Sequence, residues 1–522
     1  MHRATEAQTF GDVVVTAHGL GTQAAMEILS AGGNAVDAAI AANAVLGVCE
    51  PHTCGIGGDL FALILEPGSA GPLALNASGR AGSGADPDII RRDGGTEIPW
   101  DHPLTATIPG CVDGWESLSG RFGSMPLAAV LAPAISLAEN GFPASTELAS
   151  ALRRKETSFR EQPSARSLYE GGEPERGRRI RRRDLGRTLT SIANGGRSAF
   201  YSGSPGRAIT AATGSLITAH DLETSQADWV EPLALEVFGR TAWTIPPNSQ
   251  GYLTLAGAWI FEHLDPPRDP LEPGYFHALI EAYRSIAWER DDLVADPDFA
   301  PLLPPALVSS DRLRARSRLI TDRAVSWPTE TMPPGGTTYL CVLDRNGLGV
   351  SLIQSNFMGI GNGIAAGDQG FFLHNRGAGF NVEPGHPNEL RPGKRPLHTL
   401  SPSMWTKDGA LDLILGTRGG HLQPQLLAQV AAHLFHAGDA PGAAQARPRW
   451  TTAQLSGSSK IRVEARMAES VCEDLVRRGH DVEVASDMEG GWGPVSVIAV
   501  DSDGLRTGAP DPRVDTASVG VR

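Results

Sequence analysis

The alternation of apolar and polar residues divides the chain into segments with different expected structures. Residues 13–16 form a short apolar run that predicts a strand. Asn34 precedes the apolar segment 35–48, and Asp37 follows Asn34 by three residues, which predicts a helix that begins with a capping box. Because nearly every position in 35–48 is apolar, this helix is expected to be buried on all sides.

A glycine-rich loop at residues 54–59 separates this helix from the strand predicted at residues 60–65. A dinucleotide-binding fingerprint requires the order strand, glycine loop, helix, and here the glycines follow a helix and precede a strand. The pattern therefore argues against nucleotide binding.

The second half of the chain contains two predicted hairpins. Residues 338–343 and 348–353 read as strands joined by an Asn-Gly turn, a strong short-range hairpin signal. A second hairpin is predicted over 404–415 around Asp408-Gly409, and it is followed by helices at 423–437 and 465–478 and by strands at 482–484 and 495–500. Hairpins flanked by helices favour a layered α+β fold.

The region between these parts is expected to be helical and then irregular. Residues 128–194 are predicted to be largely helical, and 276–292 shows clear helical periodicity. The Arg-rich stretch 176–187 contains acidic residues as well, so it is interpreted as a solvated segment. The Pro-rich stretch 301–336 is interpreted as an exposed connection that ends in a strand.

Composition narrows the classes of function. The 522 residues are 41% hydrophobic and 20% charged, as in a globular protein, and are enough for one large domain or several ordinary ones. The formal net charge of −14 argues against a nucleic-acid partner, because nucleic-acid binding depends on basic patches.

Cysteines and apolar runs give expectations about environment. The five cysteines form no C-x-x-C pair, so neither a zinc site nor a disulfide framework is predicted, and no other metal or cofactor is expected. Residues 1–12 lack the pattern of a signal peptide, and no run approaches about 20 apolar residues, so no membrane span is expected. A cytoplasmic location is the resulting prediction.

Thr337 is the strongest candidate for chemistry. It follows Gly335-Gly336 and begins the strand predicted after the Pro-rich connection. If the Gly336–Thr337 bond were cut, the hydroxyl of Thr337 would lie beside its own α-amino group, whose ordinary pKa of about 7.7–8.0 suits a general base. Most Gly-Gly-Thr sequences are plain turns, so this pattern alone is weak evidence.

A set of motifs spread along the chain resembles the γ-glutamyltranspeptidase (glutathione hydrolase) family. The motifs are GGNAVDAA at 32–39, GIGGD at 55–59, TIPG at 107–110, DGW at 113–115, PPNSQG at 246–251, TT at 337–338, KRPL at 394–397, SP at 401–402, GG at 419–420 and DPR at 511–513. Their order and spacing are highly specific.

The resemblance implies a four-layer αββα fold of the N-terminal-nucleophile hydrolases. It implies a precursor that cuts itself between Gly336 and Thr337 into a large subunit, 1–336, and a small subunit, 337–522, which stay intertwined as one domain. Thr337 would then attack a small-molecule amide and form an acyl-enzyme. Gly419 and Gly420 match the family's oxyanion hole, and Ser355 matches a threonine that supports the nucleophile.

The residues that would recognise a γ-glutamyl group depart from the family pattern. Arg80 matches the arginine that binds the α-carboxylate. The segment that normally holds the α-amine reads Asn-Arg-Gly-Ala-Gly at 375–379, so Gly379 stands where a carboxylate is expected and Arg376 adds a positive charge. A substrate ammonium without a carboxylate partner would bind poorly in a buried site.

Further departures concern the same recognition site. His398 and Thr399 replace the family's serine pair, and Phe357 stands where a polar ligand is usual, unless a shift of register lets Asn356 replace it. The lid of some members is expected to be missing, because only a short run separates Phe380 from Lys394.

Three functions remain open. The family default is a γ-glutamyl hydrolase or transpeptidase acting on glutathione-like substrates. The altered residues favour a related amidase for a carboxylate-bearing acyl group without an α-amine, such as a glutaryl-cephalosporin or oxamate-type amide, with hydrolysis preferred. The third possibility is a non-catalytic relative that never matures.

Overall fold

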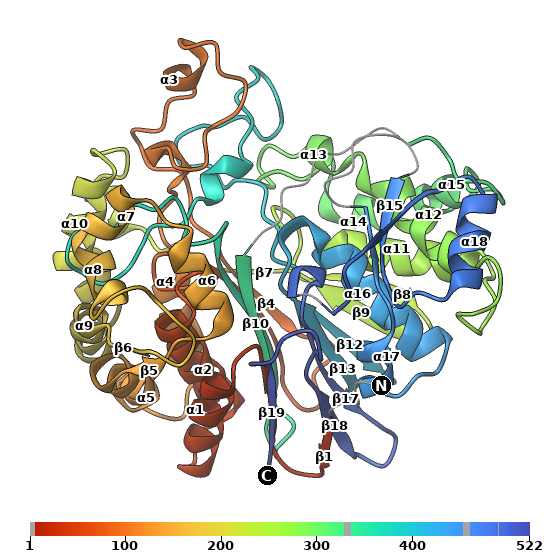
Figure 1. The fold of residues 1–522 in the computed structure, drawn as a ribbon, viewed down its shortest axis with the longest axis horizontal. Helices are drawn as coiled ribbons and strands as arrows, with labels where there is room; N and C mark the ends of the chain where they lie inside the picture. The colour runs from red at the N-terminus through yellow and green to blue at the C-terminus, as the bar shows by residue number, and fades with distance from the viewer. Residues whose placement is uncertain (1–5, 328–335, 453–459, 489) are drawn as a thin grey trace.

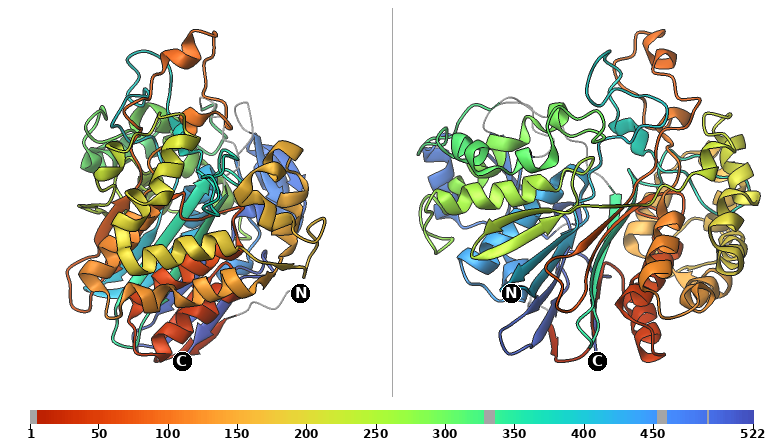
Figure 2. Two further views of the ribbon diagram at one scale, coloured as in Figure 1. Left: turned by 90° about the vertical axis from the view of Figure 1, so that its left-hand side faces the viewer. Right: turned by 180° about the vertical axis from the view of Figure 1, so that it is seen from behind.

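Two face-to-face β-sheets, each covered by helices on its outer side, make up the core of the computed structural model (Figure 1). The structure describes residues 6–327, 336–452, 460–488 and 490–522. Seen from behind, the two strand layers lie between the two helical layers (Figure 2). The predicted four-layer αββα class is confirmed.

Each main sheet has seven strands. The first sheet has the order β19 (Ser518–Val521), β2 (Val13–Thr16), β10 (Gly336–Leu343), β11 (Gly349–Phe357), β3 (Asp59–Leu65), β4 (Leu73–Ala77) and β7 (Asp228–Val230). The second sheet has the order β1 (Ala7–Thr9), β18 (Arg506–Ala509), β17 (Val495–Val500), β13 (Ala410–Thr417), β12 (Ser403–Lys407), β9 (Arg240–Thr244) and β8 (Leu233–Val237). Both sheets combine strands from before and after position 336.

The helices form two outer groups. On the side of the first sheet are α1 (Gly19–Ser30), α2 (Ala35–Cys49), α4 (Cys111–Phe122), α5 (Leu127–Asn140), α6 (Thr146–Arg153), α7 (Thr157–Glu161), α8 (Pro163–Tyr169), α9 (Arg183–Tyr201) and α10 (Ser204–Ala212). On the side of the second sheet are α11 (Tyr252–His263), α12 (Tyr275–Ala287), α13 (Arg290–Leu293), α14 (Pro304–Leu307), α15 (Ser310–Ser317), α16 (Gln423–Ala431), α17 (Pro441–Ala446) and α18 (Glu469–Arg477). The short α3 (Asp88–Arg91) lies in a protruding segment at the top of Figure 1.

Smaller elements complete the fold. They are the pair β5 (Phe142–Pro143) and β6 (Arg179–Ile180), the sheet of β14 (Trp450–Thr451), β15 (Lys460–Glu464) and β16 (Asp481–Ala485), and the π-helical turn Ala432–His436 that continues α16. Short 3₁₀ turns lie at Pro103–Thr105, Asp221–Glu223, Arg376–Gly379, Gly420–Leu422 and Gly490–Trp492.

Three apolar cores correspond to the three interfaces between layers. One joins the first sheet to helices such as α2, and a second joins the other sheet to helices such as α11 and α12. The third, which includes Tyr339, Met404 and Ile414, lies between the sheets. The strands β10 and β11 are covered on both faces, by helices on one side and by the second sheet on the other, so none of their residues is exposed.

Several sequence predictions are confirmed in detail. Asn34 caps α2 through a capping box with Asp37, and every residue of α2 is buried. The strands β10 and β11 pair in an antiparallel hairpin, and so do β12 and β13.

Two interpretations of the sequence were wrong. Arg182, in the supposedly solvated Arg-rich stretch, is 2% exposed and donates to the main-chain oxygens of Gly47, Val48 and Gly370. The connection 301–336 is not simply exposed, since it contains α14 and α15, whose Leu307 and Leu313 are buried. In both cases a distant partner made burial favourable, and local composition carried no sign of it. Residues 328–335 of that connection lie outside the described residues.

Among the helices of the described residues, none combines the length and the apolar composition needed to cross a bilayer. All five cysteines are free thiols.

Candidate active site

Thr337 is the second residue of β10, and its hydroxyl lies beside the Gly336–Thr337 peptide bond. Its Oγ1 donates to the carbonyl oxygen of Gly336 at 2.8 Å and lies 3.2 Å from Oγ of Ser355 on β11. Ser355 also donates to the oxygen of Gly336, at 2.6 Å. Thr337 and Ser355 are 1% and 2% exposed, so both hydroxyls meet the same carbonyl group away from bulk water.

An irregularity in the hairpin creates this arrangement. Gly336 pairs with Phe357 and Thr338 with Gln354, so the register shifts by one residue across Thr337. Bulges of this kind re-aim side chains and are frequent next to active sites. Phe357 has φ of 71°, which is unusual for an aromatic residue, and its N–H donates to Oγ of Ser355 at 2.7 Å. The strained residue therefore holds the supporting hydroxyl in place.

Gly419 and Gly420 lie at the same end of the sandwich as Thr337. The strand β13 packs closely against β10. The ring of Tyr339 on β10 lies so near Gly416 on β13 that an added Cβ would clash with it. The glycine pair follows that strand, and the ring of the next residue, His421, is 6.0 Å from the ring of Phe357. The backbone of both glycines has positive φ, 130° and 56°, which only glycine adopts without strain. Their N–H groups have no acceptor among the described residues.

A cavity of about 690 Å³ opens beside this end of the hairpin. Trp100, Arg290, Phe357, Arg376 and His421 contribute to its wall. The orange segment that carries α3 and the cyan loop beside it rise above this region in Figure 1. A small apolar cluster that includes Ile98, Leu104, Phe380, Val382 and Leu390 joins these two segments. The short run between Phe380 and Lys394 thus forms part of the wall of the cavity.

Arg376 is the dominant charge of this cavity. Its guanidinium stacks on Phe357 with its central carbon 3.4 Å from the ring centroid, and Nη1 donates to Oγ1 of Thr399 at 3.2 Å. Nε and Nη2 have no hydrogen-bond partner among the described residues, although the side chain is almost fully buried. Burial lowers the pKa of Arg376 to about 9, so the group stays cationic at neutral pH. A buried cation with free donors has a strong preference for an anionic ligand.

Gly379 makes room for that cation. A Cβ at Gly379 would clash with Nη2 of Arg376, so no side chain at this position is compatible with the observed guanidinium. Two departures noted in the sequence, the missing carboxylate at 379 and the added charge at 376, are therefore one structural change. The space that a carboxylate would occupy is filled by a guanidinium.

The electrostatic surroundings strengthen this preference. Arg290 donates to Oε1 of Gln250 at 3.0 Å and contacts Nδ1 of His421. Burial, followed by the charges of Arg290 and Arg376, holds the pKa of His421 well below its usual value, so the imidazole is neutral. Arg290 and Arg376 both lower the pKa of this imidazole, and Arg290 is itself ion-paired with Asp291 at 2.7 Å.

A buried polar network supports Arg376 from behind. Thr399 accepts from it, and the neighbouring His398 donates Nε2–H to Oδ2 of Asp59 at 3.1 Å while its Nδ1 accepts from Leu400 N. Burial lowers the pKa of His398 to about 4. Burial alone would raise the pKa of Asp59, but the nearby His374 and the bond from His398 keep it below its usual value. His398 and Thr399 thus form a layer behind the cavity wall.

Arg80 and Asn356 are not placed with these groups. Nη2 of Arg80 donates to Asp228 at 2.8 Å, and Arg395 binds the same carboxylate. Neither Arg80 nor Asn356 is among the residues lining the cavity of Arg376. The register does not slip, since Phe357, and not Asn356, faces that cavity.

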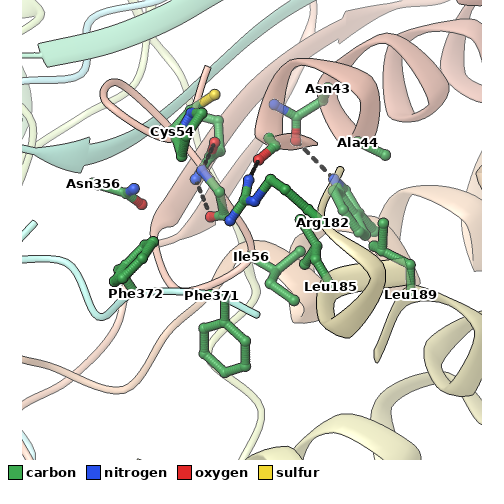
Figure 3. Close-up of a pocket in the computed structure, with 15 residues that line it drawn as sticks. Asn43, Ala44, Cys54, Ile56, Arg182, Leu185, Leu189, Asn356, Phe371 and Phe372 are labelled. Carbon is green, nitrogen blue, oxygen red and sulfur yellow. Dashed lines mark hydrogen bonds between the residues drawn. The ribbon is translucent and has the colours of Figure 1, made fainter. Parts of the chain in front are cut away.

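Asn356 instead lines a small cavity behind the glycine-rich loop (Figure 3). This space of about 10 Å³ is also bordered by Asn43 from α2, by Cys54 and by Arg182. Oδ1 of Asn356, Nδ2 of Asn43 and Nε of Arg182 have no hydrogen-bond partner among the described residues. The size and polar lining match a site for a single water molecule.

Comparison with known proteins places this geometry in a family. A family description named gamma-glutamyltranspeptidase matches residues 21–521. The chain belongs to the gamma-glutamyltranspeptidase family.

Its relatives within the family have several names. The glutathione hydrolase-like YwrD proenzyme of Bacillus subtilis is 35% identical over 98% of both chains. The oxamate amidohydrolase proenzyme of Klebsiella pneumoniae is 34% identical, over 97% of this chain and 98% of the relative. The crystal structure of a cephalosporin acylase from Bacillus halodurans superposes with a TM-score of 0.93 at 33% identity, covering 100% of this chain and 97% of the other.

Membership in the gamma-glutamyltranspeptidase family makes the chain an amidohydrolase of the N-terminal-nucleophile type. The names of its relatives include hydrolases and an acylase, and several are called proenzymes. Members of one fold differ in the groups that recognise the acyl side, so the substrate must be argued from the cavity itself.

Sequence reasoning missed several residues around the cavity of this family member. His421 directly follows the Gly419–Gly420 pair, and that adjacency was a usable signal. Arg290 and Trp100 belong to none of the motifs and could not be connected with the site without the fold. Asp59 ends the recognised glycine loop, but its bond to His398 joins positions 339 residues apart.

Proposed function

We propose that the chain is a self-processing amidohydrolase whose nucleophile is the hydroxyl of Thr337. The contact between Oγ1 of Thr337 and the oxygen of Gly336, at 2.8 Å, supports the first step, because the nucleophile already lies against the bond to be cut. The donor hydroxyl of Ser355, 2.6 Å from the same oxygen, supports it further.

Processing would proceed as an acyl shift. Oγ1 of Thr337 attacks the carbonyl carbon of Gly336, and the negative charge that develops on the carbonyl oxygen is stabilised by the hydroxyl of Ser355. Collapse breaks the C–N bond, and the proton given up by the Thr337 hydroxyl passes to the Thr337 nitrogen, which leaves as an amine. Water then hydrolyses the ester, releasing the carboxylate of Gly336 and the restored Thr337 hydroxyl. The products are the subunits 1–336 and 337–522.

The mature enzyme would use the new amine as its base. The α-amino group of Thr337 accepts the proton of the hydroxyl, which attacks the substrate amide. The N–H groups of Gly419 and Gly420 stabilise the oxyanion, and the leaving amine takes up the proton. Water enters by the same route and releases the acyl group, so hydrolysis is expected to dominate over transfer to an amine.

The proposed substrate is an amide whose acyl group carries a carboxylate and no α-amine. The unpaired Nε and Nη2 of Arg376 carry this proposal, because they offer two donors on a buried cation to a carboxylate. The family contains a relative named for oxamate, an acid amide of this kind. The cavity of about 690 Å³ also has space for a larger acyl or leaving group, such as that of an acylated cephalosporin.

A γ-glutamyl substrate is the second candidate. It is favoured by the relative named glutathione hydrolase-like, at 35% identity. It is disfavoured by the buried cation of Arg376, which would repel the α-ammonium of a glutamyl group. A cytoplasmic location and the heterodimer remain predictions.

A substrate panel tests the acyl specificity. Purified protein is assayed with oxamate, glutaryl and γ-glutamyl amides that share one leaving group where chemistry allows. We expect kcat/KM to be highest for an acyl group without an α-amine, and a preference for the γ-glutamyl amide over the glutaryl amide would overturn the proposed recognition.

Maturation is tested on a denaturing gel and by intact mass. A persistent single band of about 55 kDa in active protein would contradict processing at Gly336–Thr337.

A further inference from the structure

Three potential metal ligands, Glu50, His52 and Glu147, meet close to the backbone of Gly336. Glu50 and His52 follow the end of α2, and Glu147 lies in the first turn of α6. One ligand atom from each of the three lies within 4.8 Å of the others. The three residues come from segments almost 100 positions apart, so the grouping is a product of the fold.

Two members of this cluster lack the partners that buried polar groups normally have. Glu50 is 1% exposed and His52 is 8% exposed. Oε2 of Glu50 and both ring nitrogens of His52 have no hydrogen-bond partner among the described residues. Nε2 of His52 lies 3.8 Å from Oε2 of Glu147, beyond hydrogen-bond length. A buried carboxylate oxygen and an unbonded imidazole are costly unless a ligand satisfies them.

We propose that Glu50, His52 and Glu147 bind one divalent transition-metal ion, with Zn²⁺ as the best fit. Imidazole nitrogen and carboxylate oxygen are ordinary zinc ligands, and three protein ligands plus water complete a four-coordinate site. Ca²⁺ and Mg²⁺ fit less well, because they favour a shell made of oxygen ligands. No motif in the sequence marks this site, because it combines one histidine with two glutamates and includes no cysteine.

The observed separations require a modest contraction. Tetrahedral zinc holds its ligand atoms about 3.4 Å apart, given bond lengths of about 2.0–2.1 Å. The side chain of Glu147 is 34% exposed and can rotate toward the two buried ligands. The same exposure provides an entry path for the ion from solvent.

Arg418 acts as an outer-sphere partner and does not neutralise the cluster. Its Nη1 and Nη2 donate to the two oxygens of Glu147, at 2.8 and 2.5 Å. Each carboxylate oxygen has a second lone pair that remains available to a metal. Two carboxylates and one guanidinium leave a formal charge of −1, which favours a cation. Hydrogen bonds to ligating carboxylates are usual in metal sites.

The position of the cluster connects it to the processing region. The main-chain oxygen of His52 lies close to Gly336, since a Cβ added there would be 3.2 Å from it. The next residue, Thr53, accepts from the N–H of Asn356 at 3.1 Å, and Arg418 precedes the Gly419–Gly420 pair. A bound ion would therefore join α6 to residues 50–53, which lie beside Gly336, and through Arg418 to the segment that carries Gly419 and Gly420.

Metal binding to the full-length protein tests the site directly and does not depend on turnover. Chelator-treated protein is titrated with Zn²⁺ in a calorimeter, and Co²⁺ is added in parallel to record its absorption spectrum. We expect one ion per chain, a Co²⁺ spectrum of low coordination number and a Tm that rises with zinc concentration.

Variants of the proposed ligands distinguish zinc binding at this site from binding to exposed histidines. His52→Gln and Glu50→Gln are each expected to weaken zinc binding by at least about 100-fold, because each removes one of three protein ligands. His220→Gln is the matched control, because it removes an exposed histidine that pairs with Glu223 at 3.0 Å. Its zinc affinity should equal that of the unaltered chain.

The position of the bound zinc can be determined in the unaltered protein, so this part of the test does not depend on whether the variants fold. Crystals of the unaltered protein soaked in Zn²⁺ should give an anomalous peak between the three side chains. A peak elsewhere, no binding at one ion per chain, or loss of binding in His220→Gln alone would each overturn the proposal.

Discussion

The surroundings of Thr337 and those of Arg376 differ in how completely their polar groups are satisfied. Thr337 and Ser355 form a closed set of hydrogen bonds with Gly336, built within one hairpin. Arg376 is as deeply buried, but two of its nitrogens have no hydrogen-bond partner within the described parts of the chain. The first region is complete in the free chain, whereas the second is complete only with a ligand. In the proposed mechanism, the first region performs the reaction and the second selects the substrate.

Removing the nucleophile should have the largest effect. Thr337→Ala is expected to abolish processing and to lower turnover by roughly 10⁴-fold or more, because no other hydroxyl replaces the attacking group. Thr337→Ser should retain part of both activities. Gels and product assays follow both variants. If Thr337→Ala still splits at the same bond, the hydroxyl of Thr337 is not the agent of cleavage.

Removing the supporting hydroxyl should mainly slow maturation. Ser355→Ala takes away the donor 2.6 Å from the Gly336 oxygen and is expected to slow processing by roughly 10²–10³-fold. Ser355→Thr keeps a hydroxyl and serves as the control. The rate is measured by the loss of precursor after synthesis in vitro. Equal rates for the alanine and threonine variants would show that the bond to Gly336 has no part in cleavage.

Removing the buried cation should change specificity without affecting maturation. Arg376→Leu is expected to lower kcat/KM for carboxylate-bearing amides by roughly 30- to 1000-fold, the usual effect of deleting one partner of a buried ion pair. Amides of a neutral acyl group of the same shape should be affected little.

Arg80→Leu is the matched control for this prediction, because Arg80 is paired with Asp228 outside the cavity. Should Arg80→Leu cause the larger loss on the same substrates, the carboxylate binds to Arg80, as the resemblance to the family implies.

Filling the space beside the cation should have the smallest effect. Gly379→Ala places a Cβ against Nη2 of Arg376 and is expected to lower kcat/KM on acidic amides about ten-fold, through a displacement that costs roughly 1–2 kcal/mol. Gly120→Ala, where an added Cβ meets nothing within 4 Å, is the control. Identical kinetics for both variants would mean that Arg376 moves freely and is not pre-positioned.

Local patterns predicted the hairpin of Thr337 well. An Asn-Gly turn between apolar runs is decided by the residues of the turn itself, and the capping box at Asn34 is equally local. The buried Arg182 shows the opposite case. Its carbonyl partners belong to α2 and to Gly370, so composition around residue 182 could not reveal that it is buried.

The recognition site could be predicted only in part. The sequence alone pointed to the loss of a carboxylate at Gly379 and the gain of Arg376, but not to the fact that the guanidinium fills the vacated space. The roles of Arg80 and Asn356 depended on where their side chains point, which the alignment of motifs does not contain.

The amino-acid sequence was enough to predict several of the strands and helices, the family and the candidate nucleophile, because these depend on periodicity and on motifs of neighbouring residues. The tertiary structure alone decided which charged groups face the substrate cavity and which residues cluster around His52. These placements depend on contacts between segments tens to hundreds of residues apart, where small differences in packing decide whether a charge meets a partner, a ligand or solvent.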